Sequence, residues 1–212
     1  ASDLDNDGDI DIVSASMDDD AIAWYENTTN SSSFSANIRI SAWTEVVAGS
    51  SFDAAGDVVH ADIDGDGDLD AFIGQYAATY QSGKLPTPYY DANDGYPAYL
   101  LLNDGTGRFV DGTEAAGLVK KRNRRTYSTS FVDLDNDKDL DLLVVSDFAG
   151  MDLYLNDGTG KFTDVTDMLG EDRFSFGMAH SLADFDGDGN LDIYMVGMGS
   201  TTARRLEGMK LG

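Results

Sequence analysis

A nine-residue segment rich in aspartate occurs four times in this chain of 212 residues and strongly restricts its fold. The copies read DLDNDGDID at 3–11, DIDGDGDLD at 62–70, DLDNDKDLD at 133–141 and DFDGDGNLD at 184–192. A second repeat contains an NDGTG turn and follows two of these copies, as YLLLNDGTGRF at 99–109 and YLNDGTGKF at 154–162. Repeats of this kind predict a protein built from copies of one supersecondary unit.

Short apolar segments rich in β-branched and aromatic residues flank these Asp loops. Residues 57–61 precede the second loop, and 69–74, 140–145 and 191–196 follow the second, third and fourth. Their length and the turns that bound them predict β-strands. Each unit reads as four antiparallel strands, A to D, in which the Asp loop joins A to B and the NDGTG turn joins C to D. We therefore predict an all-β fold made of β-propeller blades, with a helical turn only near residues 114–118.

The pattern predicts about four blades that form part of a larger propeller. The repeat units span approximately residues 1–48, 49–118, 119–170 and 171–212. Because the first unit lacks strand A and the fourth ends near strand C, we expect about fourteen strands. That number is too small to close a seven-bladed ring, so we expect the chain to be a piece of a longer protein.

Each Asp loop follows the pattern D-x-D-x-D-x-x-x-D, with Asp at positions 1, 3, 5 and 9 in all four copies. Carboxylates this close together repel one another unless a cation neutralises them. Oxygen donors at this density favour Ca²⁺ over zinc or copper, whereas Mg²⁺ tends to keep its waters. Position 7 is expected to donate its backbone carbonyl. The predicted ligands of about four Ca²⁺ ions are Asp3, Asp5, Asp7, Asp9 and Asp11; Asp62, Asp64, Asp66, Asp68 and Asp70; Asp133, Asp135, Asp137, Asp139 and Asp141; and Asp184, Asp186, Asp188, Asn190 and Asp192.

Position 6 of the loop must turn sharply, which Gly permits because it adopts positive φ angles. Gly occupies this position in three loops, whereas the third loop has Lys138. A side chain there costs about 1 kcal/mol, so we expect the third site to be weaker. An EF-hand loop begins in the same way, but it needs Glu at position 12 and flanking helices. The other alternative, solvated acidic turns without metal, is disfavoured by four identical spacings.

Composition restricts the function further. The chain carries 39 acidic against 14 basic residues, a formal net charge of −25, which argues against a nucleic-acid partner. It has no Cys for disulfides or thiolate metal sites. We find no apolar run long enough for a membrane span and no nucleophile or phosphate-loop motif. We therefore expect a chain that is not an enzyme by itself, in which His60 and His180 are packed or hydrogen-bonded.

The four loops, the strand Phe72-Ile73-Gly74 and the segment YLNDGTGKF resemble the FG-GAP/VCBS repeat family. The resemblance covers nearly the whole chain and departs from the family at Lys138 and at the two ends. It implies a propeller of the integrin α-subunit type with Ca²⁺ in the A–B loops. Relatives include integrin α-subunits, bacterial surface proteins, lectins and modules attached to lyases or phospholipases, so an extracellular or cell-surface location is expected.

Two unusual segments are expected on the face opposite the Asp loops, because B–C and D–A connections share that face. One is the Tyr-rich B–C connection 75–97, and the other is the basic run 120–125. Tyr-rich loops supply contact area for sugars or proteins, and basic residues favour an anionic ligand such as an acidic glycan. A self-packed loop and a solvated basic loop are the alternatives. The candidate ligand-binding residues are Tyr76, Tyr80, Tyr89, Tyr90, Tyr96, Arg122, Arg124 and Arg125.

Three functions remain open at this point. The first is a calcium-binding extracellular module for adhesion or for recognition of glycan or protein ligands. The second is an accessory or catalytic part of a secreted polysaccharide-processing enzyme. The third is a structural subunit of a surface assembly, whose open blades pair with other copies or with the rest of its own propeller.

Overall fold

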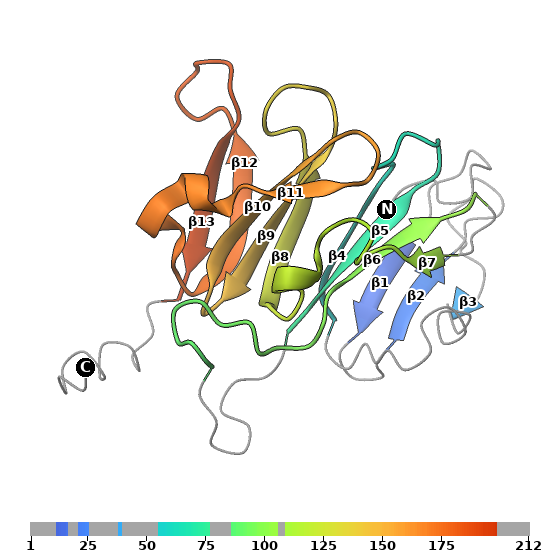
Figure 1. Ribbon diagram of the computed structural model, residues 1–212, viewed down its shortest axis with the longest axis horizontal. Helices are drawn as coiled ribbons and strands as arrows, with labels where there is room; N and C mark the ends of the chain where they lie inside the picture. Colours follow the sequence, from blue (N-terminus) through green and yellow to red (C-terminus); the bar gives the residue numbers. More distant parts are fainter. Residues whose placement is uncertain are drawn as a thin grey trace.

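The computed structural model describes residues 12–16, 21–25, 38–39, 55–76, 86–105 and 109–198, and these form thirteen strands and two short 3₁₀ helices (Figure 1). We number the four sheets as blades 1 to 4 in chain order. Blade 1 contains β1 (Ile12–Ser16), β2 (Ala21–Tyr25) and β3 (Ile38–Arg39), and blade 2 contains β4 (Ala55–Ala61), β5 (Asp70–Gln75), β6 (Tyr99–Asn103) and β7 (Phe109–Asp111). Blade 3 contains β8 (Arg125–Val132), β9 (Asp141–Asp147), β10 (Gly150–Asn156) and β11 (Phe162–Asp164), and blade 4 contains β12 (Gly177–Ala183) and β13 (Asp192–Gly197).

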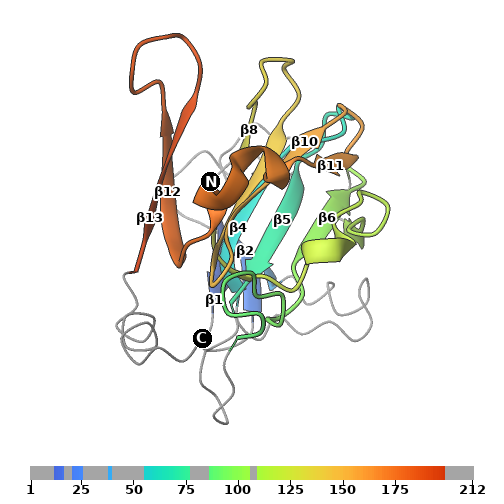
Figure 2. The same cartoon turned by 60° about the vertical axis from the view of Figure 1, so that its left-hand side comes forward.

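The prediction of an all-β fold with four-stranded antiparallel blades is confirmed. In blades 2 and 3 each strand pairs with the next one along the chain, as expected for strands A to D. The first strands of neighbouring blades contact each other, β4 with β8 and β8 with β12. Figure 2 shows the sheets standing side by side, and the described part of the chain forms an open array rather than a closed ring.

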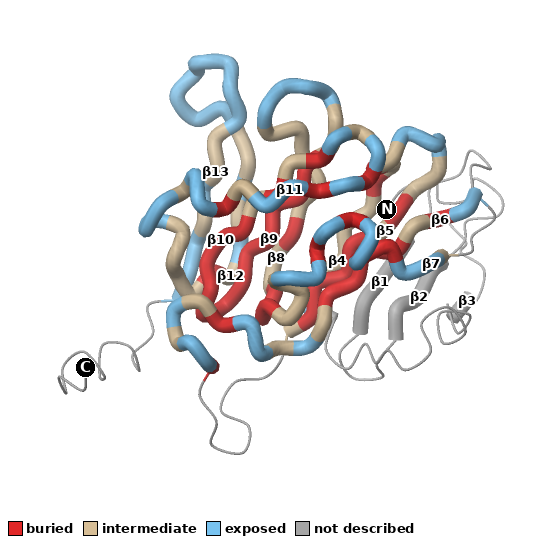
Figure 3. The backbone as a smooth tube through the Cα atoms, in the orientation of Figure 1, coloured by how far each residue is buried: buried red, intermediate tan, exposed pale blue. Residues whose placement is uncertain are grey.

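Strand β9 shows why the blades stack. All seven of its residues are buried, and buried positions run through the centres of both complete blades (Figure 3). Leu142 and Val144 pack with residues of β5 and β6 in blade 2. Leu143 and Val145 point to the other face and pack with residues of β12 and β13 in blade 4. Neighbouring side chains point to opposite faces of a strand, so both faces of β9 are apolar. Each buried Leu or Val contributes about 1.5–3 kcal/mol, and β9 gains all of this stability only when a blade covers each face.

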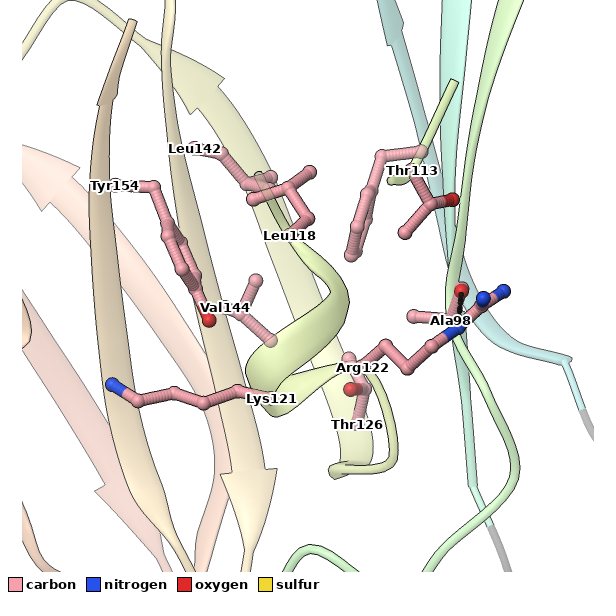
Figure 4. Close-up of a pocket in the computed structure, with 10 residues that line it drawn as sticks. Ala98, Thr113, Leu118, Lys121, Arg122, Thr126, Leu142, Val144 and Tyr154 are labelled. Atoms are coloured by element: carbon pink, nitrogen blue, oxygen red, sulfur yellow. Dashed lines mark hydrogen bonds between the residues drawn. The ribbon is translucent and has the colours of Figure 1, made fainter. Parts of the chain in front are cut away.

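The interface between blades 2 and 3 leaves almost no free volume. A cavity of about 10 Å³ lies between the blades and is lined by Leu118, Val144 and Tyr154 among others (Figure 4). On one side Arg122 donates through Nε to the carbonyl of Ala98 at 3.2 Å. A cavity of this size holds one water molecule at most, so this interface has no room for a ligand.

The 3₁₀ helices lie in the connections between blades. The chain turns at residues 113–117 and continues into η2 (Val119–Lys121), near the predicted helical turn. The expectation of no other helix is wrong, because η3 (Thr166–Arg173) follows blade 3. Gly170, with φ of 61°, divides η3 into two short turns. Both helices follow strand D of a blade, so both belong to D–A connections.

Candidate functional site

Three of the four Asp loops lie within the described residues, whereas the first, with Asp3, Asp5, Asp7, Asp9 and Asp11, lies outside them. Position 6 has a positive φ angle in all three, 96° at Gly67, 84° at Lys138 and 91° at Gly189. In each loop the amide of this residue donates to the position-1 carboxylate at 3.0–3.1 Å. Lys138 therefore keeps the geometry of the glycine loops, at a backbone strain of about 1–2 kcal/mol.

Position 4 also adopts the left-handed conformation, which the sequence reasoning missed. The φ angle is 77° at Gly65, 64° at Asn136 and 78° at Gly187. The signal was present, because every copy of the loop has Asn or Gly at position 4. These are the residues that adopt this conformation most readily.

The loop carboxylates converge on one point in each described loop. One oxygen from each of three residues lies within 4.8 Å of the others, and the sets are Asp62, Asp64 and Asp66; Asp133, Asp135 and Asp141; and Asp184, Asp186 and Asp192. An all-carboxylate set fits a hard cation such as Ca²⁺. In addition, Oδ1 of Asp133 is buried without a hydrogen-bond partner, as expected for an atom directed at a cation.

The remaining predicted ligands lie at the edge of these sets. Asp137 and Asp188 at position 5 accept the position-7 amides at 2.9 and 2.8 Å. The position-7 carboxylates of Asp68 and Asp139 lie against the glycines of the NDGTG turns so closely that a Cβ on either glycine would clash with them. This arrangement leaves the backbone carbonyl as the group that position 7 can offer to an ion.

The position-9 aspartates join each Asp loop to the NDGTG turn of the same blade. Asp141 is fully buried, and it accepts the amide of Leu134 through Oδ2 at 2.8 Å and that of Asn156 through Oδ1 at 2.9 Å. Asp70 forms the matching pair of bonds in blade 2. The side chain of Asn156 also donates to the carbonyl of Ile63 in the loop of blade 2 at 2.8 Å. The two sequence repeats therefore occur together because they form one hydrogen-bonded unit, and this unit also links neighbouring blades.

The ionisation of the loops also fits a bound cation. Burial raises the pKa of Asp70 to about 6, and the charges of Asp64 and Asp66 add to this, while two backbone amides oppose it. Burial raises the pKa of Asp64 and of Asp141 as well. A divalent ion among these groups would favour their charged forms, and it would thereby remove an electrostatic penalty that the folded loops carry without it.

The described part of the Tyr-rich connection packs against its own chain at the end of the molecule opposite the Asp loops (Figure 1). The amide of Ala92 donates to the carbonyl of Phe148 at 3.0 Å, and that of Gly95 donates to the carbonyl of Asn123 at 2.7 Å. Residues 86–97, which we call the insertion, thus dock on blade 3 and on the segment before it. This favours the self-packed alternative for these residues, while leaving their outer surface accessible.

An aromatic cluster forms where the insertion meets blades 3 and 4, and it consists of Tyr89, Tyr90, Phe148 and Phe176. The ring of Tyr89 lies 5.3, 5.2 and 5.7 Å from those of Tyr90, Phe148 and Phe176 in edge-to-face arrangements. Phe148 is buried although its φ angle is 61°, a conformation that is strained for a bulky residue. Tyr90 is 57% exposed. The strained turn at Phe148 places its ring against Tyr89. The packed rings of Tyr89 and Phe176 support the exposed ring of Tyr90.

The other tyrosine candidates do not join this cluster. Tyr76 is half-buried and stacks on Tyr127 at 4.3 Å. Tyr96 is 36% exposed at the end of the insertion. Tyr80 lies outside the described residues.

The arginines of the basic run are held by the chain's own groups. Arg124 is 3% exposed, and it donates through Nε to Asp152 at 2.8 Å and through Nη2 to Asp91 at 2.7 Å. Burial alone would lower the pKa of Arg124, but these carboxylates raise it above the usual value. Arg125 donates to Asp94 at 3.0 Å, and Arg122 lies over the ring of Tyr99. The three arginines of the run are therefore neither solvated nor unpaired.

His180 links the first strands of two blades. Its Nε2 lies 2.7 Å from Oγ of Ser130, and burial lowers its pKa. Among the described residues no group hydrogen-bonds to its buried Nδ1. The pair lacks the orienting carboxylate of a Ser–His–Asp triad, and its observed contact is between β8 and β12.

Asp147 at the end of β9 predicts a measurable pH dependence. It is 4% exposed, and burial raises its pKa to about 6 although Phe148, Arg125 and Tyr76 oppose the shift. Because the folded pKa exceeds the unfolded one, the contribution of this group to stability is complete below about pH 4 and is lost as pH rises through 6.

Relative to Asp147→Asn, the parent should lose about 1–2 kcal/mol between pH 5 and 7.5, measured by urea unfolding in saturating calcium. Asp157→Asn is the control, since the Thr159 hydroxyl lowers the pKa of Asp157, and this carboxylate is therefore ionised in both the folded and the unfolded state over this pH range and should leave the slope unchanged. Equal pH slopes for the parent and Asp147→Asn would show that Asp147 titrates normally.

The match to a family of known repeats agrees with the architecture. The sequence profile of the FG-GAP-like repeat matches residues 3–73 and 133–195, well over half of the chain. No curated protein is significantly similar. A lectin from Agrocybe aegerita, described as specifically recognising non-reducing terminal N-acetylglucosamine, has a solved structure that superimposes with a TM-score of 0.49 at 20% identity. The match covers 92% of this chain and 44% of the lectin, so the chain spans less than half of that protein. No helix in the described residues is long and apolar enough to cross a membrane.

Proposed function

Because the chain belongs to the FG-GAP-like repeat family, we propose that it is a calcium-binding recognition module of the β-propeller type that acts outside the cytosol and has no catalytic activity of its own. The observation that carries this proposal is the convergence of three carboxylates in every described Asp loop. The loops repeat the same left-handed turns and the same amide-to-carboxylate hydrogen bonds. An arrangement that is built three times in one chain serves a purpose common to all three blades.

We propose different roles for the two ends of the blades, with calcium bound at one end and the ligand at the other. The loop carboxylates are committed to the ion and to backbone amides, so they have little left to offer a ligand. The opposite end carries the insertion and the aromatic cluster, where Tyr90 is exposed above packed rings. Exposed tyrosines on a rigid base are common in recognition surfaces. Glycans or proteins, bound for recognition or adhesion, are the ligands we propose for this end.

The proposed location rests on the affinity expected of such loops. Extracellular calcium modules typically bind with Kd of roughly 10⁻⁴–10⁻³ M. Sites this weak fill in extracellular fluid but not at the far lower calcium concentrations of the cytosol. Sub-micromolar affinity at every loop would remove this argument for an extracellular location.

Calcium titration of the intact chain tests the proposal. We expect close to four Ca²⁺ per chain, because the first loop has the same Asp pattern as the three described ones. Isothermal titration should show one weaker site, since Lys138 brings strain and positive charge to the third loop. Lys138→Gly should strengthen that site alone, and Asp135→Asn should remove it. A total of zero or one bound ion would contradict the proposed function.

A further inference from the structure

An open pocket of about 350 Å³ lies where the insertion, η2 and η3 meet. This volume falls in the range of pockets that hold small ligands. All three segments are connections between strands rather than parts of the Asp loops. The lining is polar, and its charged residues are Lys120, Lys121, Arg124, Arg173, Asp91, Asp164 and Asp167.

A network of ion pairs fixes the floor of the pocket. Nζ of Lys121 lies 2.8 Å from Asp152 and 2.8 Å from Asp164. Arg124 bridges Asp152 and Asp91, and Arg173 lies 3.7 Å from Asp91. Alternating positive and negative groups therefore follow one another across the floor. Because each group is held by its neighbours, the pocket is preorganised before any ligand enters.

The charges of this pocket balance. Its lining carries four cationic side chains and three carboxylates, and Asp152, which is 1% exposed directly beneath Arg124, supplies a fourth negative charge. A strongly anionic ligand would compete with the carboxylates for their cations, and a strongly cationic one would compete with the arginines and lysines. The preference for an acidic glycan that the basic run suggested from sequence therefore does not follow from the folded arrangement.

Two charged side chains at the rim remain available to a ligand. Lys120 and Asp167 are exposed, and within the described part of the chain neither side chain has a hydrogen bond or an ion pair. Tyr90, which is 57% exposed, precedes the lining residue Asp91 in the insertion. The pocket thus offers an available donor and an available acceptor beside groups of mixed charge, and the exposed ring of Tyr90 belongs to the residue that precedes its lining in the chain.

We propose that this pocket binds a neutral, hydroxyl-rich saccharide unit. A hydroxyl group donates and accepts hydrogen bonds at once, so neighbouring hydroxyls can bridge the alternating carboxylates and cations without bringing net charge. The C–H face of the sugar ring packs on Tyr90, whose ring is apolar on its face and polar at its tip. This inference rests on the recognition role proposed above and assigns its ligand class and its position.

The test measures binding of individual sugars to the intact, calcium-loaded chain. Saturation-transfer NMR and isothermal titration are run with neutral hexoses, with N-acetylhexosamines and with the corresponding hexuronic acids. We expect a neutral sugar to bind more tightly than its hexuronic acid. Asp167→Asn should weaken binding roughly tenfold or more, since hydrogen bonds to charged groups are stronger than those to neutral ones, and Tyr90→Ala should weaken it because the sugar loses its aromatic contact.

Matched variants separate the pocket from general effects. Tyr194→Ala removes a tyrosine that is 62% exposed on β13, and Asp172→Asn removes an exposed carboxylate of η3 that does not line the pocket. Both should bind sugar as the parent does. Parent-like binding by Tyr90→Ala and Asp167→Asn, or tighter binding of hexuronic acids, would overturn the inference.

Calcium content measured on the same samples keeps the two proposals distinguishable. Failure of every sugar to bind a chain that holds its calcium would overturn the saccharide pocket alone. Failure to hold calcium would instead contradict the proposed function of the loops.

Discussion

Removal of calcium should lower the melting temperature of this protein by on the order of 10 °C or more. A ligand that binds only the folded state stabilises it by mass action. For a Kd of roughly 10⁻⁴–10⁻³ M and about 10 mM calcium, each loop gains about 1.4–2.7 kcal/mol. Several loops together therefore contribute several kcal/mol, and each kcal/mol shifts the melting temperature of a domain of this size by about 2–4 °C.

Hydrogen bonds connect the calcium site proposed in the third loop to the interface between blades 2 and 3. Asp141 belongs to the converging carboxylates of the third loop, and it also holds the amide of Asn156. Asn156 in turn donates to the carbonyl of Ile63 in the loop of blade 2. Loss of the ion leaves repelling carboxylates at a point that fixes two blades, so the whole array should weaken rather than one loop.

Thermal melts by circular dichroism, with calcium and with excess chelator, measure this effect at constant ionic strength. Asp135→Asn removes one converging carboxylate and should reduce the calcium-dependent shift. Asp172→Asn removes an equal charge outside the loops and should leave the shift unchanged. A chelator that does not move the melting temperature of the parent would contradict the calcium role.

The strands of the blades could be predicted because they depend on short apolar segments and on the turn residues that bound them. Strand β9 contacts a blade on each face and so must be apolar on both, which gives it a continuous apolar segment. The turn at position 6 was predicted from Gly67 and Gly189, and Lys138 adopts it as well. Such features need only the residues of one unit, and every unit repeats them.

The ion pairs of the basic run could not be predicted from the sequence, because the partner residues are remote in sequence. Arg124 pairs with Asp152, 28 residues away, and with Asp91, 33 residues away. No local pattern marks these carboxylates in a chain that has 39 acidic residues. The aromatic cluster could not be predicted for the same reason, since Phe148 follows β9 of blade 3 and Phe176 precedes β12 of blade 4. Long-range pairing therefore decides the part of the molecule where we place the ligand.

Replacement of Asp152 by Ala should destabilise the fold by about 3–5 kcal/mol. Its carboxylate is 1% exposed and contacts Arg124 and Lys121 at 2.8 Å and Arg173 at 3.8 Å. Removing it leaves the buried guanidinium of Arg124 beside two other cations with one fewer counter-charge. The penalty is the uncompensated buried charge rather than the loss of one attractive contact.

Urea unfolding of Asp152→Ala and of Asp164→Asn provides the matched comparison. Asp164 also pairs with Lys121, but its side chain is 30% exposed, so solvent screens the pair and we expect a loss of about 1 kcal/mol or less. Similar losses for both variants would show that burial of Asp152 does not decide its contribution.

The loss at Asp152 should also be independent of calcium. Among the described residues, Asp152 shares no hydrogen-bond or ion-pair partner with the Asp loops, because its contacts come from η2, η3 and the segment before β8. Effects at sites without shared partners usually add within about 0.3–0.5 kcal/mol. Asp152→Ala should therefore lower the unfolding free energy equally with calcium and with chelator. A loss that disappeared in chelator would show that the ion-pair network and the calcium loops stabilise the blades as one coupled system.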